Sequence, residues 1–564
     1  MVFSITSCTK ENNEDDGTPK NWTNPNGQSN PGVTEDMTVL SNQKPNPYNI
    51  DTMKHASRIV RGSDAEIQTN FLYIRFEPAD LDELQLLEDD STLFLSDTPL
   101  DYEFSIEGTY YHDPNISDED PTYYYCVIGV NQATPNVSYT TLDDLYIPNI
   151  DTESDIECEA LDLCNINYMT GNDKGMFRTK PDGQITVSVD GSYIGVNNVK
   201  VIAYNWFRNK STYTDINGNF SIDKKFRRAR IKVKYISNKA TMRMAREENI
   251  YRMLSTYKTK IKNGSGYEFV NSELNNISFN YDYYSDITTK GAENWNCAVV
   301  WNSIYEGHKY AGQMGINKPP NGLVVYLTSY LSEGAAPMLN NMGRSGYNVF
   351  KLNEKIEYLQ EWYFIAADIL TPTLTLTLLA VLQKETPDIV IGMEDSRLFE
   401  EVEGMTIHEL GHSIHYLKAG PVFWEAEIEY IVDNDGYGTK TSTNSGICAL
   451  TESWANYFQA YAYMLKNDNS QHTVLQSIEY MIGGGGFDWF PSGMYWDLFD
   501  HESTLPAFLT ENPLINDNVS GITIPDVYDL FSNCSDIDDF KSKLKINYPN
   551  QATDIEYLFE SYGY

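Results

Sequence analysis

The sequence predicts a multidomain protein in which mostly β N-terminal modules, including a small β-sandwich, precede an α+β, helix-rich C-terminal domain. Three observations support this fold class. The chain has 564 residues, which is too many for one hydrophobic core. Up to about residue 236, short apolar and aromatic runs alternate with Pro, Asp and Gly, a pattern typical of strands and turns. From about residue 237 onward, apolar residues recur mainly at helical spacing.

Residues 1–46 are expected to form a flexible N-terminal tether, because residues 9–46 are rich in Asn, Pro, Asp, Gly and Thr. The stretch Ile5-Thr6-Ser7-Cys8, followed by an acidic segment, resembles the lipobox of bacterial lipoproteins. This resemblance implies a lipid anchor on Cys8 and a location at the bacterial cell envelope or cell surface, with secretion as the alternative. Only seven residues precede Cys8, fewer than a complete signal peptide needs.

Residues 47–180 are predicted to form a mostly β module. Its clearest strands lie at 70–76 and 122–128, because both are short, Tyr-containing apolar runs bounded by turn residues. Nothing in these residues indicates a function for the module.

A basic stretch further along the chain, Lys224 to Arg230, is expected to be solvated or to contact an acidic neighbouring domain.

Residues 181–236 are predicted to form a second β module. Strands are expected at 183–187 and 199–204, and residues 214–222 are expected to form a turn that leads into a third strand. The segment resembles the carboxypeptidase regulatory-like β-sandwich. Modules of that family are usually structural accessories, so the resemblance implies spacing or substrate presentation.

Residues 237–564 are predicted to form the catalytic domain, with a first helix at 239–260. They contain His408-Glu409-Leu410-Gly411-His412. Histidines four residues apart lie on one side of a helix, where both imidazoles can bind one zinc ion at about 2 Å. Glu409 can then reach a water molecule beside the ion and act as a general base. Gly411 would allow another backbone to approach this helix closely.

A catalytic zinc ion requires a third protein ligand and one open position. We expect Glu452 to be that ligand, because it lies in an apolar helical run that ends near Leu465. His415 faces away from the other two histidines on a helical wheel, which favours a packing or substrate-side role. The alternation of acidic and apolar residues at 423–430 is typical of a solvated face. The competing carboxylates for the third position are those of Glu425, Glu427, Glu429, Asp433 and Asp435.

With Glu452 as the third ligand, the catalytic half resembles a gluzincin-type metallopeptidase, in which HExxH is followed by a glutamate on a second helix. This resemblance implies one catalytic Zn²⁺ and a secreted zinc metalloendopeptidase. It also implies a strand that pairs with the substrate backbone, expected at 386–393, with a second strand of the same sheet at 321–327. Gluzincins supply a Tyr or His that stabilises the oxyanion. Tyr495 is predicted for this role, with His501 and His472 as alternatives.

Composition limits the partners of the chain. Its net charge is −39, from 41 Lys and Arg against 80 Asp and Glu, which repels nucleic acid and anionic membranes. No nucleic acid is therefore expected as a partner, and a membrane only through the anchor on Cys8. We expect a monomer that acts on proteins or peptides, with a glycoprotein as an alternative substrate. The alternative hypotheses are an exopeptidase, a glycopeptide-directed peptidase and a non-catalytic zinc-containing surface adhesin.

Overall fold

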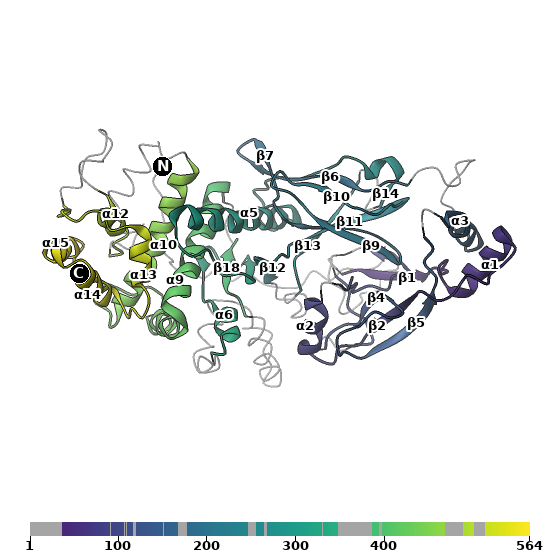
Figure 1. Ribbon diagram of the computed structural model, residues 1–564, viewed down its shortest axis with the longest axis horizontal. Coiled ribbons are helices and arrows are strands. Elements are labelled where there is room, and N and C mark those ends of the chain that lie inside the picture. The colour runs from purple at the N-terminus through teal and green to yellow at the C-terminus, as the bar shows by residue number, and fades with distance from the viewer. Residues whose placement is uncertain are drawn as a thin grey trace, which may run out of the picture.

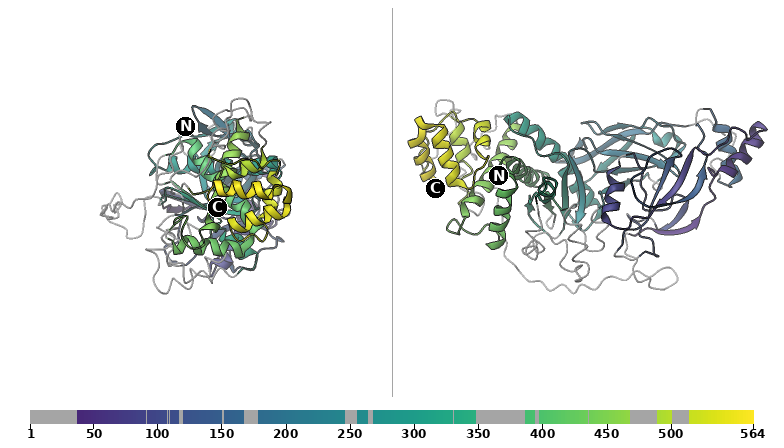
Figure 2. Two further views of the ribbon diagram at one scale, coloured as in Figure 1. Left: turned by 90° about the vertical axis from the view of Figure 1, so that its left-hand side faces the viewer. Right: turned by 60° about the horizontal axis from the view of Figure 1, so that its bottom comes forward.

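The computed structural model describes residues 37–564 except 91, 107, 109, 117–119, 150–151, 167–177, 246–254, 264–267, 330, 348–385, 394–396, 435, 468–488 and 501–513. In the described part, sheets fill the N-terminal half and helices gather toward the C-terminus (Figure 1). The molecule is elongated, and the last helices lie at the end opposite the first β module (Figures 1 and 2). The predicted order of a β-rich half followed by a helix-rich part is therefore confirmed.

The first module contains a three-stranded antiparallel sheet, of order β4-β2-β5, and a separate β1–β3 pair. Its strands are β1 (Val39–Gln43), β2 (Phe71–Phe76), β3 (Tyr102–Ile106), β4 (Tyr124–Gly129) and β5 (Tyr139–Leu145). Its helices are α1 (Ile50–Arg61), α2 (Leu81–Asp89) and α3 (Ser154–Leu163). Strands β2 and β4 confirm the two predicted ones, and buried Ile74, Phe76 and Cys126 join them in one core.

Two further sheets follow, of order β10-β6-β15 with β7 beside β6, and β13-β11-β8-β9 with β14 beside β11. Strands β6, β8 and β10 confirm the three predicted in 181–236. Both sheets contribute fully buried residues to one core, among them Ile185, Val201 and Val233. The strands are β6 (Asp182–Val189), β7 (Ser192–Gly195), β8 (Lys200–Asn205), β9 (Arg208–Tyr213), β10 (Asn219–Ser221), β11 (Arg228–Lys234), β13 (Lys258–Ile261), β14 (Glu268–Val270) and β15 (Ile277–Tyr281).

The helix predicted at 239–260 is wrong where the structure describes these residues. They contain strands β12 (Ala240–Ala245) and β13 instead. In β12, the buried apolar residues Ala240, Met242 and Met244 occupy every second position, which is the period of a strand, and Arg243 between them is buried as well. A short apolar segment fits the helical and strand periods almost equally well, and pairing with distant strands decides between them.

A four-stranded sheet of order β12-β16-β18-β17 supports the C-terminal helices. Its other strands are β16 (Leu323–Thr328), β17 (Gly334–Ala335) and β18 (Ile389–Gly392). The two strands predicted to belong to one sheet do so, as β16 and β18, and they pair with each other. However, β18 lies between β16 and β17, so both of its edges are occupied and it cannot pair with a substrate. Among the described strands, β17 forms that edge of the sheet.

Two long helices, α9 (Phe399–Asp433) and α10 (Ser445–Lys466), pack against each other, and α9 also packs against α5 (Lys290–Met314). Their buried faces belong to the same hydrophobic core as the four-stranded sheet. The remaining described α-helices are α6 (Leu339–Arg344), α12 (Met494–Phe499), α13 (Ile524–Leu530), α14 (Ile537–Asn547) and α15 (Ala552–Ser561).

Cys8 and residues 1–36 of the predicted tether lie outside the described residues, so the lipoprotein resemblance stays a prediction. The flexible tether predicted up to residue 46 is wrong at its end, where β1 pairs with β3. Within the described ranges, every helix is too short or too polar to span a lipid bilayer. The six cysteines in these ranges are free thiols.

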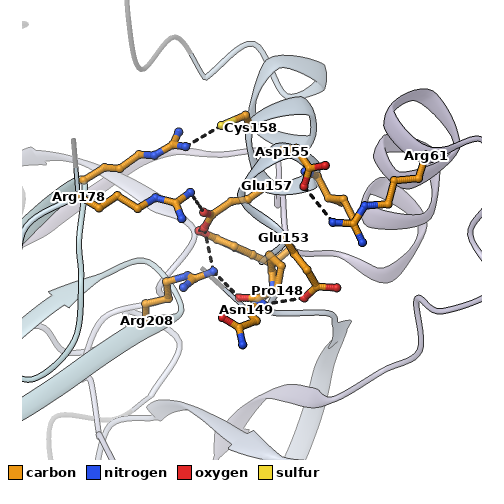
Figure 3. Close-up of polar contacts among 12 residues, drawn as sticks. Arg61, Pro148, Asn149, Glu153, Asp155, Glu157, Cys158, Arg178 and Arg208 are labelled. Carbon is orange, nitrogen blue, oxygen red and sulfur yellow. Dashed lines mark hydrogen bonds and ion pairs between the residues drawn. The ribbon is translucent and has the colours of Figure 1, made fainter. Parts of the chain in front are cut away.

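A buried carboxylate attaches α3 to the second module (Figure 3). Glu157 is 4% exposed and accepts a hydrogen bond from the Tyr48 hydroxyl at 2.7 Å. The guanidinium groups of Arg178 and Arg208 each lie 2.9 Å from its carboxylate oxygens. On the same helix, the Cys158 sulfur accepts a hydrogen bond from Arg227 at 2.6 Å, so part of the predicted basic stretch contacts the first module. These contacts join two β modules that are separate in sequence.

Replacement of Glu157 tests this attachment. In Glu157→Ala, two buried guanidinium groups lose their counter-charge, which is expected to lower the free energy of unfolding by roughly 3–5 kcal/mol. The matched control is Asp155→Ala on the same helix, because Asp155 makes an exposed ion pair with Arg61 and should change stability by less than about 1 kcal/mol. Urea unfolding monitored by circular dichroism measures both. A similar loss in the two variants would contradict the assigned role of Glu157.

Candidate metal centre

The two histidines of the HExxH segment lie one turn apart on α9. Their Nε2 atoms are 3.1 Å from each other, and their rings are nearly perpendicular, at 81°. His412 is 7% exposed, while His408 is half-buried. A helix places residues four apart on one side, so this local arrangement follows directly from the spacing.

Helix α10 brings Glu452 to the two histidines. One carboxylate oxygen lies 3.4 Å from His408 Nε2 and the other lies 3.4 Å from His412 Nε2. Gly411 makes this approach possible, because a Cβ atom there would lie only 3.0 Å from the Ala455 Cα atom on α10. The expected role of Gly411 as a point of close backbone contact is therefore seen in the packing of the two helices.

The donor atoms fit a tetrahedral metal ion. Zinc with ligands at about 2.0–2.1 Å requires ligand atoms roughly 3.3–3.4 Å apart. The two Nε2 atoms lie 3.1 Å apart and each faces a different oxygen of Glu452 at 3.4 Å, so one atom from each residue lies within 4.8 Å of the other two. Burial would raise the pKa of Glu452, but His412 and His408 outweigh it and lower that pKa to about 2. A carboxylate that stays ionised beside two imidazoles is a suitable ligand. His408, His412 and Glu452 therefore form a group that could hold a metal ion.

Glu409 lies beside this group and is 4% exposed. Its Oε2 atom is buried and has no hydrogen-bond partner among the described residues. Burial raises its pKa to about 8, His408 opposes this shift, and Glu452 and Glu333 add to it. The other carboxylate oxygen lies against β17, since a Cβ atom on Gly334 would be 2.5 Å from it. Glu409 is thus a buried carboxylate between the candidate ligands and the edge of the sheet.

Helix α9 contains a break that returns its second half to the site. Gly420 has φ +82°, a left-handed conformation that favours glycine, and Pro421 follows as the next segment begins. Beyond the break, Trp424 packs on the ring of His412 and donates a hydrogen bond to the Ala336 carbonyl at 3.0 Å. The second half of α9 therefore connects the histidines to the chain immediately after β17.

The competing carboxylates lie outside the ligand group of the described residues. Glu427 is buried instead of solvated, so the expected exposed face is wrong at this position; its carboxylate accepts a hydrogen bond from Thr451 at 2.8 Å. Glu425 accepts one from Tyr347. Asp435 lies outside the described residues. His415 is fully buried against Phe423, Trp424 and Phe531, which fits the expected packing role.

The structure does not bring Tyr495 to the candidate ligands. Its hydroxyl is buried and lies 3.1 Å from the Ser453 hydroxyl and 3.4 Å from the Leu450 carbonyl. Successive residues turn by about 100° around a helix, so Leu450 faces nearly away from Glu452 on α10. The alternatives His472 and His501 lie outside the described residues.

Tyr437 is a site residue that the sequence analysis missed. It lies between α9 and α10 and packs edge-on against Phe490, with ring centroids 5.4 Å apart. Burial raises the pKa of its phenol well above the usual value, and the nearby carboxylates of Glu452, Glu409 and Glu333 add to this effect. The phenol therefore remains protonated, within electrostatic range of the Glu452 and Glu409 carboxylates. A loop tyrosine in a chain with 41 tyrosines gives no periodic signal that could identify it.

Comparisons of this chain with protein-family models, with curated proteins and with solved structures find no match.

Metal analysis tests the ligand group. The purified chain is expected to hold one zinc ion, and Glu452→Ala is expected to lose it because one of three protein ligands is removed. Glu425→Ala serves as the matched control, since it also removes one carboxylate from this region but should keep the metal. Inductively coupled plasma mass spectrometry after dialysis measures the stoichiometry. Loss of zinc from Glu425→Ala, or its retention in Glu452→Ala, would contradict this ligand set.

Proposed function

We propose that this chain is a zinc-dependent metalloendopeptidase of the gluzincin type that hydrolyses peptide bonds of proteins or peptides. The observation that carries the proposal is the group His408, His412 and Glu452, whose ligand atoms all lie within 4.8 Å of one another, beside a buried Glu409 whose Oε2 lacks a partner among the described residues. A structural zinc site normally has four protein ligands. The three found in the described ranges leave a position for water, which favours catalysis over a non-catalytic adhesin.

The proposed division of roles follows from these positions. Zinc, when bound by His408, His412 and Glu452, lowers the pKa of the attacking water and polarises the substrate carbonyl. Glu409 removes the proton from this water and then donates it to the leaving amine. Burial favours the protonated form of Glu409, so the side chain can retain the proton until the amine departs.

Strand β17 supports a peptide as the substrate. It pairs with β18 on one side, and no other described strand pairs with its outer edge. An extended peptide can add to such an edge through main-chain hydrogen bonds. Because Gly334 lies against the Glu409 carboxylate, a peptide bound along β17 would pass beside the proposed general base.

Tyr437 takes the role of oxyanion stabiliser in this proposal. Its protonated phenol can donate a hydrogen bond to the negative charge that develops on the substrate carbonyl oxygen. The proximity of Glu409 and Glu452 supports this assignment, and Tyr495 has no comparable position.

The remaining modules fit accessory roles. The two sheets that contain the strands of residues 181–236 support a small β-sandwich that spaces or presents the substrate. An anchor on Cys8 would hold the enzyme at the cell envelope, where proteins or peptides outside the cell are its substrates.

Glu409→Gln tests the catalytic proposal. The amide cannot accept a proton from water, so kcat is expected to fall by about 10²–10⁴-fold while the zinc content stays unchanged. Cleavage of a peptide library monitored by mass spectrometry measures the activity, and the cleavage sites separate endopeptidase from exopeptidase action. Glu425→Gln is the matched control and should retain activity. Equal turnover by Glu409→Gln and the unaltered chain would exclude this mechanism.

Two Tyr→Phe variants test the oxyanion assignment. Tyr437→Phe removes a donor that acts in the transition state, so kcat is expected to fall by roughly 10²–10³-fold with little change in KM. Tyr495→Phe removes a hydroxyl that contacts Ser453 and the Leu450 carbonyl, and its activity should be close to that of the unaltered chain. Steady-state kinetics on one library-derived peptide compares them. The opposite ranking would return the role to Tyr495.

A further inference from the structure

A cavity of about 550 Å³ lies between the first module and the sheet β13-β11-β8-β9. Residues of the first module line one side, among them Leu87, Phe94, Asp97, Tyr110, His112 and Tyr124, and side chains of β8, β9, β11 and β13 line the other. This volume lies within the range of roughly 300–1,000 Å³ that is usual for small-molecule sites. It is separate from the candidate metal centre, and none of the proposed ligands lines it.

Lysines occupy the face of the sheet that looks into this cavity. The strand register places Lys234 directly opposite Lys200 on β8 and directly opposite Lys258 on β13. Two residues earlier on β11, Lys232 lies opposite Lys260. Ile231 and Val233 alternate with these lysines and are buried on the other face. Like charges directly opposite each other destabilise a sheet, so this arrangement needs a compensating charge.

Only part of this charge is compensated by described residues. Lys258 Nζ lies 3.3 Å from a carboxylate oxygen of Asp97. Lys232 lies over the Phe94 ring, with its Nζ 4.5 Å from the centroid. Lys200 and Lys234 form neither an ion pair nor a hydrogen bond with any described residue. Burial, together with a neighbouring lysine, lowers the pKa of both, and the charge of Glu88 opposes this shift only at Lys234.

The positive charge of this cavity contrasts with the negative charge of the whole chain. The molecule carries a net charge of −39, yet this cavity collects six lysines, namely Lys200, Lys210, Lys232, Lys234, Lys258 and Lys290. Three acidic residues, Glu88, Asp90 and Asp97, also line it. If the lysines served only to attach the first module, each would be expected to form an ion pair or a hydrogen bond with that module. Among the described residues, Lys200 and Lys234 form neither, although the charge of Glu88 on the first module acts on Lys234.

We propose that this cavity binds a small ligand that carries at least two phosphate or sulfate groups. Such a ligand would face Lys200, Lys234 and Lys258 together and remove the repulsion among them. Ammonium groups bind these oxyanions through charge-assisted hydrogen bonds. The hydroxyl groups of Ser211 and Tyr213, which also line the cavity, can contact the uncharged remainder of the ligand.

Isothermal titration calorimetry on the full chain tests the proposal. The probes are inorganic pyrophosphate and a multiply sulfated disaccharide; sodium chloride at equal ionic strength and the unsulfated disaccharide serve as controls. Saturable binding at one ligand per chain is expected for at least one probe, and the stronger probe distinguishes a phosphate from a sulfate ligand. The double variant Lys200→Gln/Lys234→Gln is expected to weaken this binding at least about tenfold, because it removes two charged donors.

Lys309→Gln is the matched surface control, since Lys309 forms an exposed ion pair on α5. It should bind as the unaltered chain does. The single variant Lys200→Gln covers the case in which the double variant fails to unfold cooperatively, and it should weaken binding severalfold. The proposal is overturned if neither probe binds saturably, if the cavity variants that fold keep full affinity, or if Lys309→Gln weakens binding equally.

Discussion

The close contact between α9 and α10 is the constraint on which the candidate metal centre depends. Gly411 lies between the two histidines in sequence, and a Cβ atom there would be 3.0 Å from the Ala455 Cα atom. The contact sets the distance at which the Glu452 carboxylate meets both imidazoles. Metal–ligand distances tolerate changes of only about 0.2 Å. A residue with no ligand atom of its own therefore has as much influence on the site as the ligands have.

The sequence predicted the parts of this site that depend on local geometry. A helix fixes the relation between residues four apart, so the histidine pair needed no knowledge of the fold. The proximity of Glu452 depends on helix packing, and the sequence supported it only through its place in an apolar helical run. The same reasoning did not locate Tyr495, because its hydroxyl contacts α10 at Leu450, on a face that points away from Glu452. Tyr437 occupies a loop between two helices, where no periodic pattern predicts a neighbour.

The same difference between local and distant contacts explains the fold predictions. Strands β2, β6 and β8 are short runs rich in apolar residues with turn residues on either side, so the sequence was sufficient for them. Strand β12 pairs in parallel with β16, about eighty residues later, and this distant pairing overrides the helical pattern expected there. Strand β17 has two residues, too few for any periodic signal. Its importance comes from its place at the edge of the sheet beside Glu409.

The buried carboxylates around the histidines give an independent reason for a cation at this site. Burial raises the pKa of Glu409 and of Glu427 to about 8, and the charge on Glu452 contributes to both shifts. Burial also raises the pKa of Glu333. Without a positive charge, Glu409 and Glu427 would hold protons at neutral pH. A divalent ion bound at Glu452 would favour their ionised forms, so metal binding would be coupled to proton release. In the proposed function, that coupling would leave Glu409 ionised, the state in which it can accept a proton from water.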